Sequence, residues 1–256
     1  MDNNSIGERI VGETEDISYS KVHDFFEERS RNENYKHKYN YVLYLDDSPE
    51  IAVMRDKQGK ERVSKLLDIK EGMRVLDIGC GIGRWGELFC KNGLFYVGMD
   101  GSQGMIDRAE ENLAEFDNKK LFVGELQELD KALADADIQG PFDIIFMSGV
   151  LMYLNDDDIN RVFSVFPKLA HAGTQLCFIE SMSDSERLTL REIYAEELKQ
   201  NYSAIYRSVS EFLGMMQNGF GNHFELKCNE LMDFSDGLQK KREHVTMEHC
   251  VIWVAK

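Results

Sequence analysis

The hydrophobic pattern of the chain changes in character near residue 73. Before that point apolar residues recur at helical spacing, and in residues 17–31 they form one stripe. This stripe consists of Ile17, Val22, Phe25 and Phe26. Ser48 and Pro49 then predict the start of a second helix, since serine caps helices and proline favours the first helical position. We expect that helix to end near Leu67.

From residue 73 onward, short apolar runs alternate with amphipathic segments. The runs are Arg74–Ile78, Phe95–Met99, Leu121–Val123, Phe142–Met147 and Leu176–Ile179, and the helices are expected near 84–91, 102–116, 156–166 and 184–200. Strands that are buried on both faces read as continuous apolar runs, so this alternation predicts a parallel sheet covered by helices. Phe224–Phe234 and Val245–Ala255 have no helix between them and predict a terminal antiparallel hairpin.

These elements predict one α/β unit. We expect a Rossmann-like, mostly parallel seven-stranded sheet with helices on both faces, a C-terminal antiparallel hairpin and an N-terminal helical lid. Residues 1–68 are expected to form the lid segment, with residues 1–16 frayed. Residues 69–256 are expected to form the main domain, in one compact unit with the lid.

The charge and the cysteines narrow the class of partner. Asp and Glu number 46 against 30 Lys and Arg, which gives a formal charge of −16 and argues against nucleic acids and anionic membranes as partners. The five cysteines form no C-x-x-C pair, so we expect no disulfide framework and no metal site. The polar N-terminus is not a signal peptide, and no apolar run reaches the roughly 18 residues of a membrane span. A cytoplasmic protein is expected.

The strongest chemical signal is a glycine-rich turn between a buried strand and a helix. It reads Asp77-Ile78-Gly79-Cys80-Gly81-Ile82-Gly83. The missing side chains let the backbone turn tightly and let a ligand lie against it. Asp100 ends the second strand, a position that suits a carboxylate binding two ribose hydroxyls.

Two cofactor classes share this arrangement. A dinucleotide site uses G-x-G-x-x-G with pyrophosphate at the helix N-terminus. Here the third glycine of that pattern, Gly86, comes two positions late, and Asp77 would repel a pyrophosphate. A carboxylate in the turn can instead pair with an ammonium group. S-adenosylmethionine carries an ammonium and a sulfonium and no phosphate.

The motif Leu76-Asp77-Ile78-Gly79-Cys80-Gly81-Ile82-Gly83 resembles the D-x-G-x-G-x-G signature of the class I S-adenosylmethionine-dependent methyltransferase family. The resemblance is close over roughly residues 70–180. It implies that Asp77 and the glycine backbone hold the methionine end of the cofactor and that Asp100 holds the ribose. The full cofactor set implied is Asp77, Gly79, Cys80, Gly81, Gly83, Trp85, Asp100, Gly101, Ser102, Met105, Glu125, Leu126, Met147 and Ser148.

Some of these positions also have plain structural interpretations. Met105 and Leu126 could pack in the hydrophobic core as well as against the adenine. Trp85 fits a contact in the core or with the lid, and Gly83 fits close packing of the helix on the strand. The resemblance implies that an acid after the third strand binds the adenine amino group; the family often has Asp there, and this chain has the longer Glu125.

The acceptor site is expected at the carboxyl ends of the strands, beneath the lid. Candidate catalytic residues are His23, Tyr153, Glu180, Arg207 and His249, and none of them stands out as the base. Arg207, in the inserted segment 202–220, suits a substrate anion or an ion pair with Glu211 one turn on.

The resemblance implies methyl transfer from S-adenosylmethionine to an oxygen or nitrogen of a small molecule, with S-adenosylhomocysteine as product. The N-terminal part loosely resembles methyltransferases of sugars and other secondary metabolites. Two alternatives stay open: a catalytically inactive cofactor-binding partner protein, and a nicotinamide-dependent oxidoreductase. A monomer and a homodimer both fit the sequence.

Overall fold

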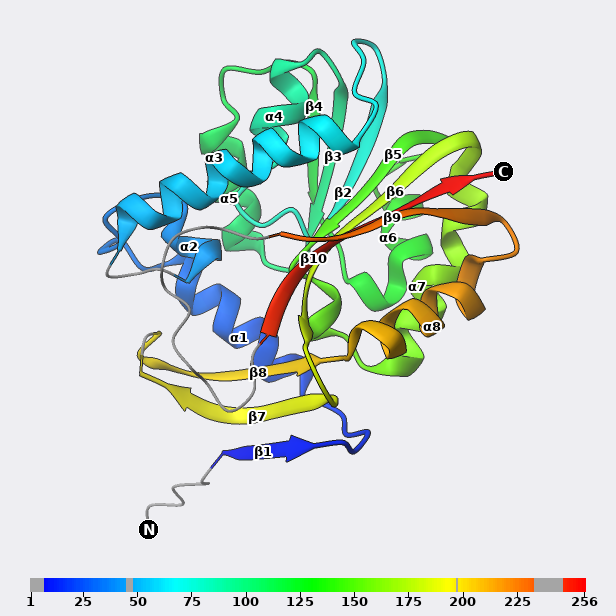
Figure 1. Ribbon diagram of the computed structural model, residues 1–256. Coiled ribbons are helices and arrows are strands. Elements are labelled where there is room, and N and C mark those ends of the chain that lie inside the picture. The colour runs from blue at the N-terminus through cyan, green and yellow to red at the C-terminus, as the bar shows by residue number, and fades with distance from the viewer. Residues whose placement is uncertain (1–6, 45–47, 197, 233–245) are drawn as a thin grey trace.

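The computed structural model describes residues 7–44, 48–196, 198–232 and 246–256. Its centre is a seven-stranded sheet in the order β4-β3-β2-β5-β6-β10-β9 (Figure 1). The strands are β2 (Arg74–Ile78), β3 (Phe95–Asp100), β4 (Lys119–Val123), β5 (Phe142–Ser148), β6 (Ala170–Ser183), β9 (Phe224–Leu231) and β10 (Thr246–Ala255). The first five run parallel, and β10 pairs antiparallel with both β6 and β9. The predicted sheet and terminal hairpin are confirmed.

Helices cover both faces of the sheet because the strand residues are apolar on both sides. One face packs against α3 (Pro49–Leu66), α4 (Gly86–Lys91) and α5 (Gln103–Asn112). The other packs against α6 (Leu129–Asp135), α7 (Asp156–Leu169) and α8 (Val209–Phe220). Short 3-10 turns, η1 (Leu126–Glu128) and η2 (Leu151–Tyr153), follow β4 and β5. The parallel strands therefore end together at one edge of the layered core.

The N-terminal segment lies across that edge. It contains α1 (Tyr19–Ser30) and α2 (Asn40–Leu43) before α3. Buried Phe25 of α1 packs with Tyr153 and Tyr202, and Tyr41 of α2 belongs to a cluster with Met105. The two helices predicted in this segment, α1 and α3, are confirmed. The helices α1 and α2 cover the ends of the strands, where the site is expected, and α3 packs on one face of the sheet (Figure 1).

Two expectations about secondary structure, one near the N-terminus and one after β6, are wrong. Part of the segment expected to be frayed forms β1 (Glu8–Val11), and the helix expected over 184–200 is absent. In its place β7 (Leu188–Ala195) and β8 (Gln200–Tyr206) form an antiparallel sheet with β1, in the order β1-β7-β8. Both β7 and β8 are rich in β-branched and aromatic residues, which favour an extended backbone. Pairing of β7 with β1 and β8 supplies the backbone hydrogen bonds.

No helix within the described part of the chain is both long enough and apolar enough to cross a membrane.

Candidate cofactor and acceptor site

The glycine turn begins where β2 ends. Gly79, Gly81 and Gly83 have positive φ values of 74°, 53° and 71°, a conformation that favours glycine. A Cβ on Gly79 would lie 2.5 Å from a methyl group of Val150, in the loop after β5. A Cβ on Gly83 would lie 2.8 Å from Leu113, so this third glycine also serves helix packing. Substitution at these positions would therefore both strain the turn and push its neighbours apart.

Asp100 joins the end of β3 to the turn. One of its carboxylate oxygens accepts a hydrogen bond from the Gly81 backbone N–H at 2.8 Å, and the other accepts from Ser102 N–H at 2.9 Å. Burial raises the pKa of Asp100 even though these two bonds favour its ionised form. Ser102 in turn caps α5, because its hydroxyl accepts from Met105 N–H at 3.1 Å. The turn, β3 and α5 thus meet at a single carboxylate.

Asp77 is the second acid of the turn, and it is only 1% exposed. The hydroxyl of Tyr96 donates to it at 2.7 Å. Burial raises the pKa of Asp77 to about 7, and the bond from Tyr96 opposes this rise. A cationic ligand group beside Asp77 would lower its pKa and relieve the desolvation cost.

A third acid reaches the same place from the lid. Glu27 of α1 accepts hydrogen bonds from the Ser102 hydroxyl at 2.7 Å and from Gly104 N–H at 3.3 Å. Although desolvation acts in the opposite direction, these bonds lower the pKa of Glu27. Val42 of α2 also lies over the turn, 3.1 Å from the place of a Cβ on Gly81. The sequence offered no signal for Glu27, because its position depends on how α1 packs against α5.

The remaining predicted cofactor residues divide between the turn and the core. Glu125 lies beside Gly101, 3.7 Å from the place of a Cβ there, and Ser148 ends β5. Buried core positions are taken by the side chains of Cys80, Trp85, Met105 and Met147, and Leu126 packs against the core. Trp85 in particular is buried, and its ring packs at a tilt against Phe146, with the ring centroids 5.0 Å apart. That placement matches the plain core interpretation.

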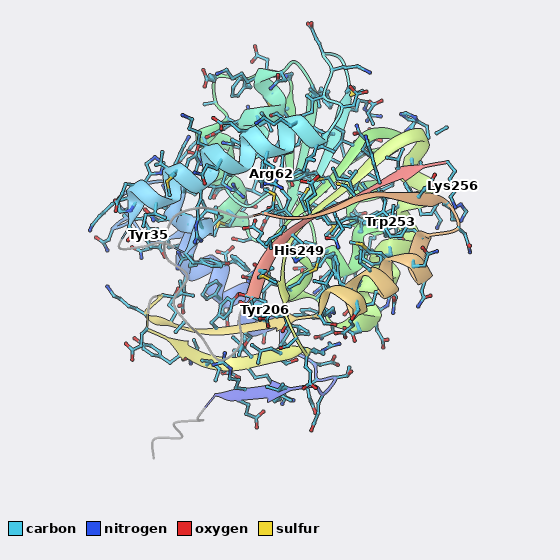
Figure 2. All side chains as sticks on the ribbon, in the orientation of Figure 1. Tyr35, Arg62, Tyr206, His249, Trp253 and Lys256 are labelled. Carbon is cyan, nitrogen blue, oxygen red and sulfur yellow. The ribbon has the colours of Figure 1, made fainter. Side chains whose placement is uncertain are left out.

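Tyr153 belongs to a chain of four tyrosine hydroxyls between η2, β8 and the end of α2. Its hydroxyl lies 2.7 Å from that of Tyr44 and 3.1 Å from that of Tyr202, which lies 3.0 Å from that of Tyr206. Tyr206 is visible at the end of β8 in Figure 2. This cluster forms the wall between the lid and the strand ends.

Arg207 is committed to the protein itself. Its guanidinium donates to Asp156 and to the backbone carbonyls of Leu151 and Leu154, and only 2% of the residue is exposed. The expected partner Glu211 binds Arg187 instead, at 2.6 Å. The ion pair expected between Arg207 and Glu211 is therefore corrected: Arg207 fastens the end of β8 to the start of α7. Its role toward a substrate anion stays a prediction.

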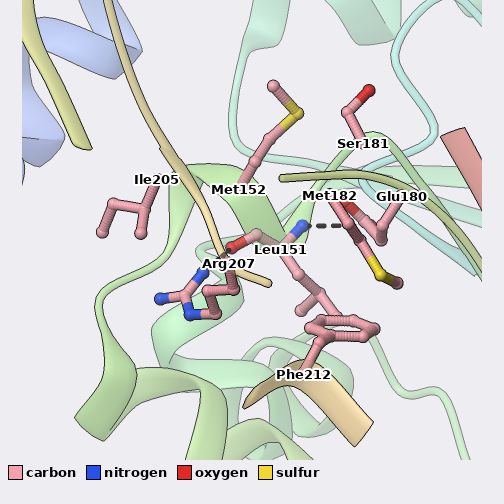
Figure 3. Close-up of a pocket in the computed structure, with 8 residues that line it drawn as sticks. All are labelled: Leu151, Met152, Glu180, Ser181, Met182, Ile205, Arg207 and Phe212. Carbon is pink, nitrogen blue, oxygen red and sulfur yellow. Dashed lines mark hydrogen bonds between the residues drawn. The ribbon is translucent and has the colours of Figure 1, made fainter. Parts of the chain in front are cut away.

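The three other catalytic candidates lie in different surroundings. Glu180 is buried at the carboxyl end of β6 and faces the loop after β5 (Figure 3). His249 lies opposite Glu180 on β10, where its Nδ1 is 2.9 Å from the Asn229 side-chain oxygen (Figure 2). His23 is exposed on α1, one turn before Glu27. Among the residues described, no group of three or more His, Cys, Asp or Glu side chains is placed so that it could hold a metal ion.

Comparisons with known proteins show that the chain is similar to methyltransferases. The sequence model of a family described as a methyltransferase domain matches residues 76–176. The chain is 29% identical over 176 residues to phosphoethanolamine N-methyltransferase 1 of Arabidopsis thaliana, which covers 67% of this chain and 33% of that protein. It is 30% identical over 98 residues to a 23S rRNA (uracil(1939)-C(5))-methyltransferase of Neisseria lactamica, which covers 33% of this chain and 22% of that protein. The chain spans less than half the length of the first curated relatives it matches.

Solved structures share the fold. Phosphoethanolamine N-methyltransferase 1 of Haemonchus contortus, solved with phosphoethanolamine and S-adenosylhomocysteine, superposes with a TM-score of 0.65 at 15% identity. The match covers 91% of this chain and 48% of that one. At this level of identity the likeness concerns the fold.

Proposed function

Because the chain belongs to the class I S-adenosylmethionine-dependent methyltransferase family, we propose that it transfers the methyl group of S-adenosylmethionine to an oxygen or nitrogen of a small molecule. The observation that carries the proposal is the junction at Asp100. That carboxylate is fixed by backbone N–H groups of the turn and of α5, and it stands at the end of the second strand of the motif. This is the position from which an acid binds ribose hydroxyls in nucleotide-binding α/β folds.

The charges around the turn suit this cofactor. Asp77, Asp100, Glu27 and Glu125 supply carboxylates, and the nearby Arg84 already pairs with Asp56 at 3.2 Å. A ligand with an ammonium and a sulfonium and without phosphate matches such a site. S-adenosylmethionine would lie with its methionine end near Asp77 and its ribose near Asp100, and it would supply the electrophilic methyl group.

We assign the acceptor to the class of small molecules. The formal charge of −16 disfavours a polyanion such as RNA, since its phosphates would be repelled. The relatives that act on phosphoethanolamine, by their names, illustrate a small acceptor on this fold. The tyrosine wall formed by Tyr44, Tyr153, Tyr202 and Tyr206 is the surface that such an acceptor would meet beneath the lid.

Calorimetric titration with S-adenosylhomocysteine tests the cofactor. We expect S-adenosylhomocysteine to bind with micromolar affinity and NADH not to bind. In Asp100→Ala the affinity for S-adenosylhomocysteine should fall roughly tenfold or more, because a charge-assisted hydrogen bond is lost. Asp107→Ala, an exposed acid on α5, is the matched control and should bind normally. Equal affinity in Asp100→Ala and the control would contradict the assignment of Asp100.

A cofactor-binding protein without catalysis is the second candidate. It is favoured by one observation: the tyrosine hydroxyls of the wall already bond to one another. Formation of S-adenosylhomocysteine from S-adenosylmethionine, in the presence of a panel of small amines and alcohols, separates the two candidates. Tight cofactor binding with no turnover on any acceptor would favour the second.

A further inference from the structure

The first lid helix, α1, crosses the start of α5 at close range. Gly104 in the first turn of α5 makes this possible, because a Cβ there would lie 2.7 Å from the Cβ of Ser30. Ser30 itself is buried, and its backbone carbonyl accepts a hydrogen bond from Arg108 Nε at 3.2 Å. A side chain at position 104 would therefore push the two helices apart.

Glu27 brings a negative charge from the lid to the N-terminus of α5. The first turn of a helix leaves backbone N–H groups without an internal acceptor. The lid and the helix share these groups in α5: Glu27 accepts from Gly104 N–H at 3.3 Å, and the Ser102 hydroxyl accepts from Met105 N–H at 3.1 Å. A carboxylate is favoured here because the N-terminal end of the helix dipole is positive. Glu27 thus acts as a helix cap that belongs to another helix.

Ser102 joins this cap to the carboxylate that we assign to the ribose. Its backbone N–H donates to Asp100 at 2.9 Å, and its hydroxyl donates to Glu27 at 2.7 Å. The hydroxyl has a single proton, so it has no second hydrogen bond to donate. Ser102 is also buried, so the surrounding side chains restrict its movement. Asp100 and Glu27 are held by the two ends of one residue, and a change in the orientation of one affects the hydrogen bonds of the other.

The charges of Glu27 and Asp100 oppose the docking of α1. Burial is the main cause of the raised pKa of Asp100, and the negative charges of Glu125 and Glu27 raise it further. Arg31 pairs with Glu27 at 3.1 Å, but its side chain is 75% exposed, so solvent screens its charge. Positive charge or hydrogen-bond donors beside Asp100 would reduce the repulsion and favour the docked position of α1.

The same helix contacts the wall that we propose meets the acceptor. Phe25 packs against Tyr202 with the ring centroids 5.5 Å apart, and Phe26 packs against Tyr153 with the centroids 5.1 Å apart. The position of α1 therefore affects the cofactor side through Glu27 and the acceptor side through Phe25 and Phe26.

We infer that Glu27 is a positioning residue through which binding of S-adenosylmethionine at Asp100 tightens the docking of α1 on α5. The inference rests on the proposed function and goes beyond it, because it assigns the residue that links the cofactor side of the lid to its acceptor side. Coupling of this kind is reciprocal, so docking of α1 also raises the affinity for the cofactor.

Hydrogen–deuterium exchange of residues 19–30, measured by mass spectrometry on the full chain, tests the inference. S-adenosylmethionine is the probe, without an acceptor and at a concentration that saturates each protein. In the wild type we expect it to slow exchange of these amides roughly fivefold or more, the lower end of the usual range for coupled sites. Asp24 is an exposed acid on the same helix, and Asp24→Ala should respond like the wild type.

Two substitutions of Glu27 separate coupling from simple support of the helix. Glu27→Ala removes the acceptor, so α1 should exchange quickly both with and without the probe. Glu27→Gln retains an oxygen for Ser102 and Gly104 but carries no charge, so α1 should stay docked in both conditions. In each variant the probe should change the exchange rate by less than about twofold. A residue that only held the helix in place would leave the wild-type ratio intact in Glu27→Gln.

A wild-type ratio in Glu27→Gln would overturn the inference, even if Glu27→Ala failed to fold. Unchanged exchange in a wild-type protein that calorimetry shows to bind the probe would overturn it as well, and the proposed function would then stand. If the wild type bound neither S-adenosylmethionine nor S-adenosylhomocysteine, the proposed function would fall and the inference with it. By reciprocity, Glu27→Ala should bind S-adenosylmethionine roughly fivefold more weakly than Asp24→Ala, and equal affinities would contradict the coupling.

Discussion

Asp77, the acid that we propose binds the ammonium group of the cofactor, lowers the stability of the ligand-free protein. It is buried beside Tyr96, and its pKa is raised from 3.8 to about 7. Between these values the folded protein binds a proton that the unfolded chain has released. Stability therefore falls as the pH rises from about 4 to about 7, and it levels off above that range. The ligand-free protein is least stable at the pH where Asp77 is ready to bind a cation.

Asp77→Asn removes this cost. We expect the variant to gain about 1–3 kcal/mol over the wild type between pH 5 and pH 8, measured by urea unfolding at both values. The same variant should bind S-adenosylhomocysteine more weakly, because the carboxylate is lost. Asp107→Asn, whose side chain is exposed, should show neither effect. A stability difference that is independent of pH would show that Asp77 keeps an ordinary pKa.

At the scale of single residues, the sequence predicted those site residues that lie close to one another along the chain. Asp77, the three glycines, Asp100 and Ser102 lie in or next to one strand-turn-helix pattern, so their positions follow from the motif. Glu27 comes from a helix some seventy residues away, and only the packing of α1 on α5 brings it to Ser102. The assigned ligand contacts of these residues stay predictions that the binding experiments address.

Among the elements, the start of α7 is held by charges from β7 and β8. Asp156 accepts from Arg187 at 2.8 Å and also binds Arg207, and both arginines are buried. Although burial opposes it, these guanidinium groups lower the pKa of Asp156. The network joins the small β1-β7-β8 sheet to the main domain.

Asp156→Ala should therefore destabilise the protein by roughly 3 kcal/mol at pH 7, since it leaves buried guanidinium groups without their shared acid. Asp157→Ala, the exposed neighbour in the same first turn, should cost much less. In the wild type, the contribution of Asp156 is present above its unfolded pKa and is lost as the pH falls through its lowered folded pKa. Urea unfolding of the three proteins at pH 7 and pH 3 checks both statements. Equal losses in the two variants would assign the effect to the helix dipole.

Sequence patterns predicted the long, strongly apolar elements and failed at the small sheet. The strands β2 and β5 are buried on both faces, so their apolar runs are unambiguous. The half-buried residues of β7 fit a helical pattern and a strand pattern equally, and pairing with β1 and β8 decides between them. Because Arg187 lies just before β7 and Arg207 just after β8, the sequence did not predict that both bind Asp156 on α7 either.

Taken as a whole, the molecule has two apolar layers that share one sheet. Trp85 lies in the layer beneath α3, α4 and α5, and Trp253 lies in the layer beneath α7 and α8. The chain has two tryptophans, so Trp85→Phe and Trp253→Phe each leave one fluorescent reporter. In each variant we expect the fluorescence and far-UV circular dichroism transitions in urea to coincide, because neither layer is buried without the sheet. Separate midpoints within one variant would mean that the layers unfold independently.

The position of β10 has a consequence for folding during synthesis. In space β10 lies between β6 and β9, but in the chain β9 comes first, and its pairing partner is β10. On a ribosome, residues 224–231 emerge before the strand that connects them to the sheet and must wait in water. The composition of β9 suits this delay: Phe224 is its one fully buried residue, and Glu225, Lys227 and Glu230 keep the segment polar. An edge strand with charged residues tolerates an unpaired interval, and it offers neighbouring nascent chains a less adhesive edge than an apolar strand would.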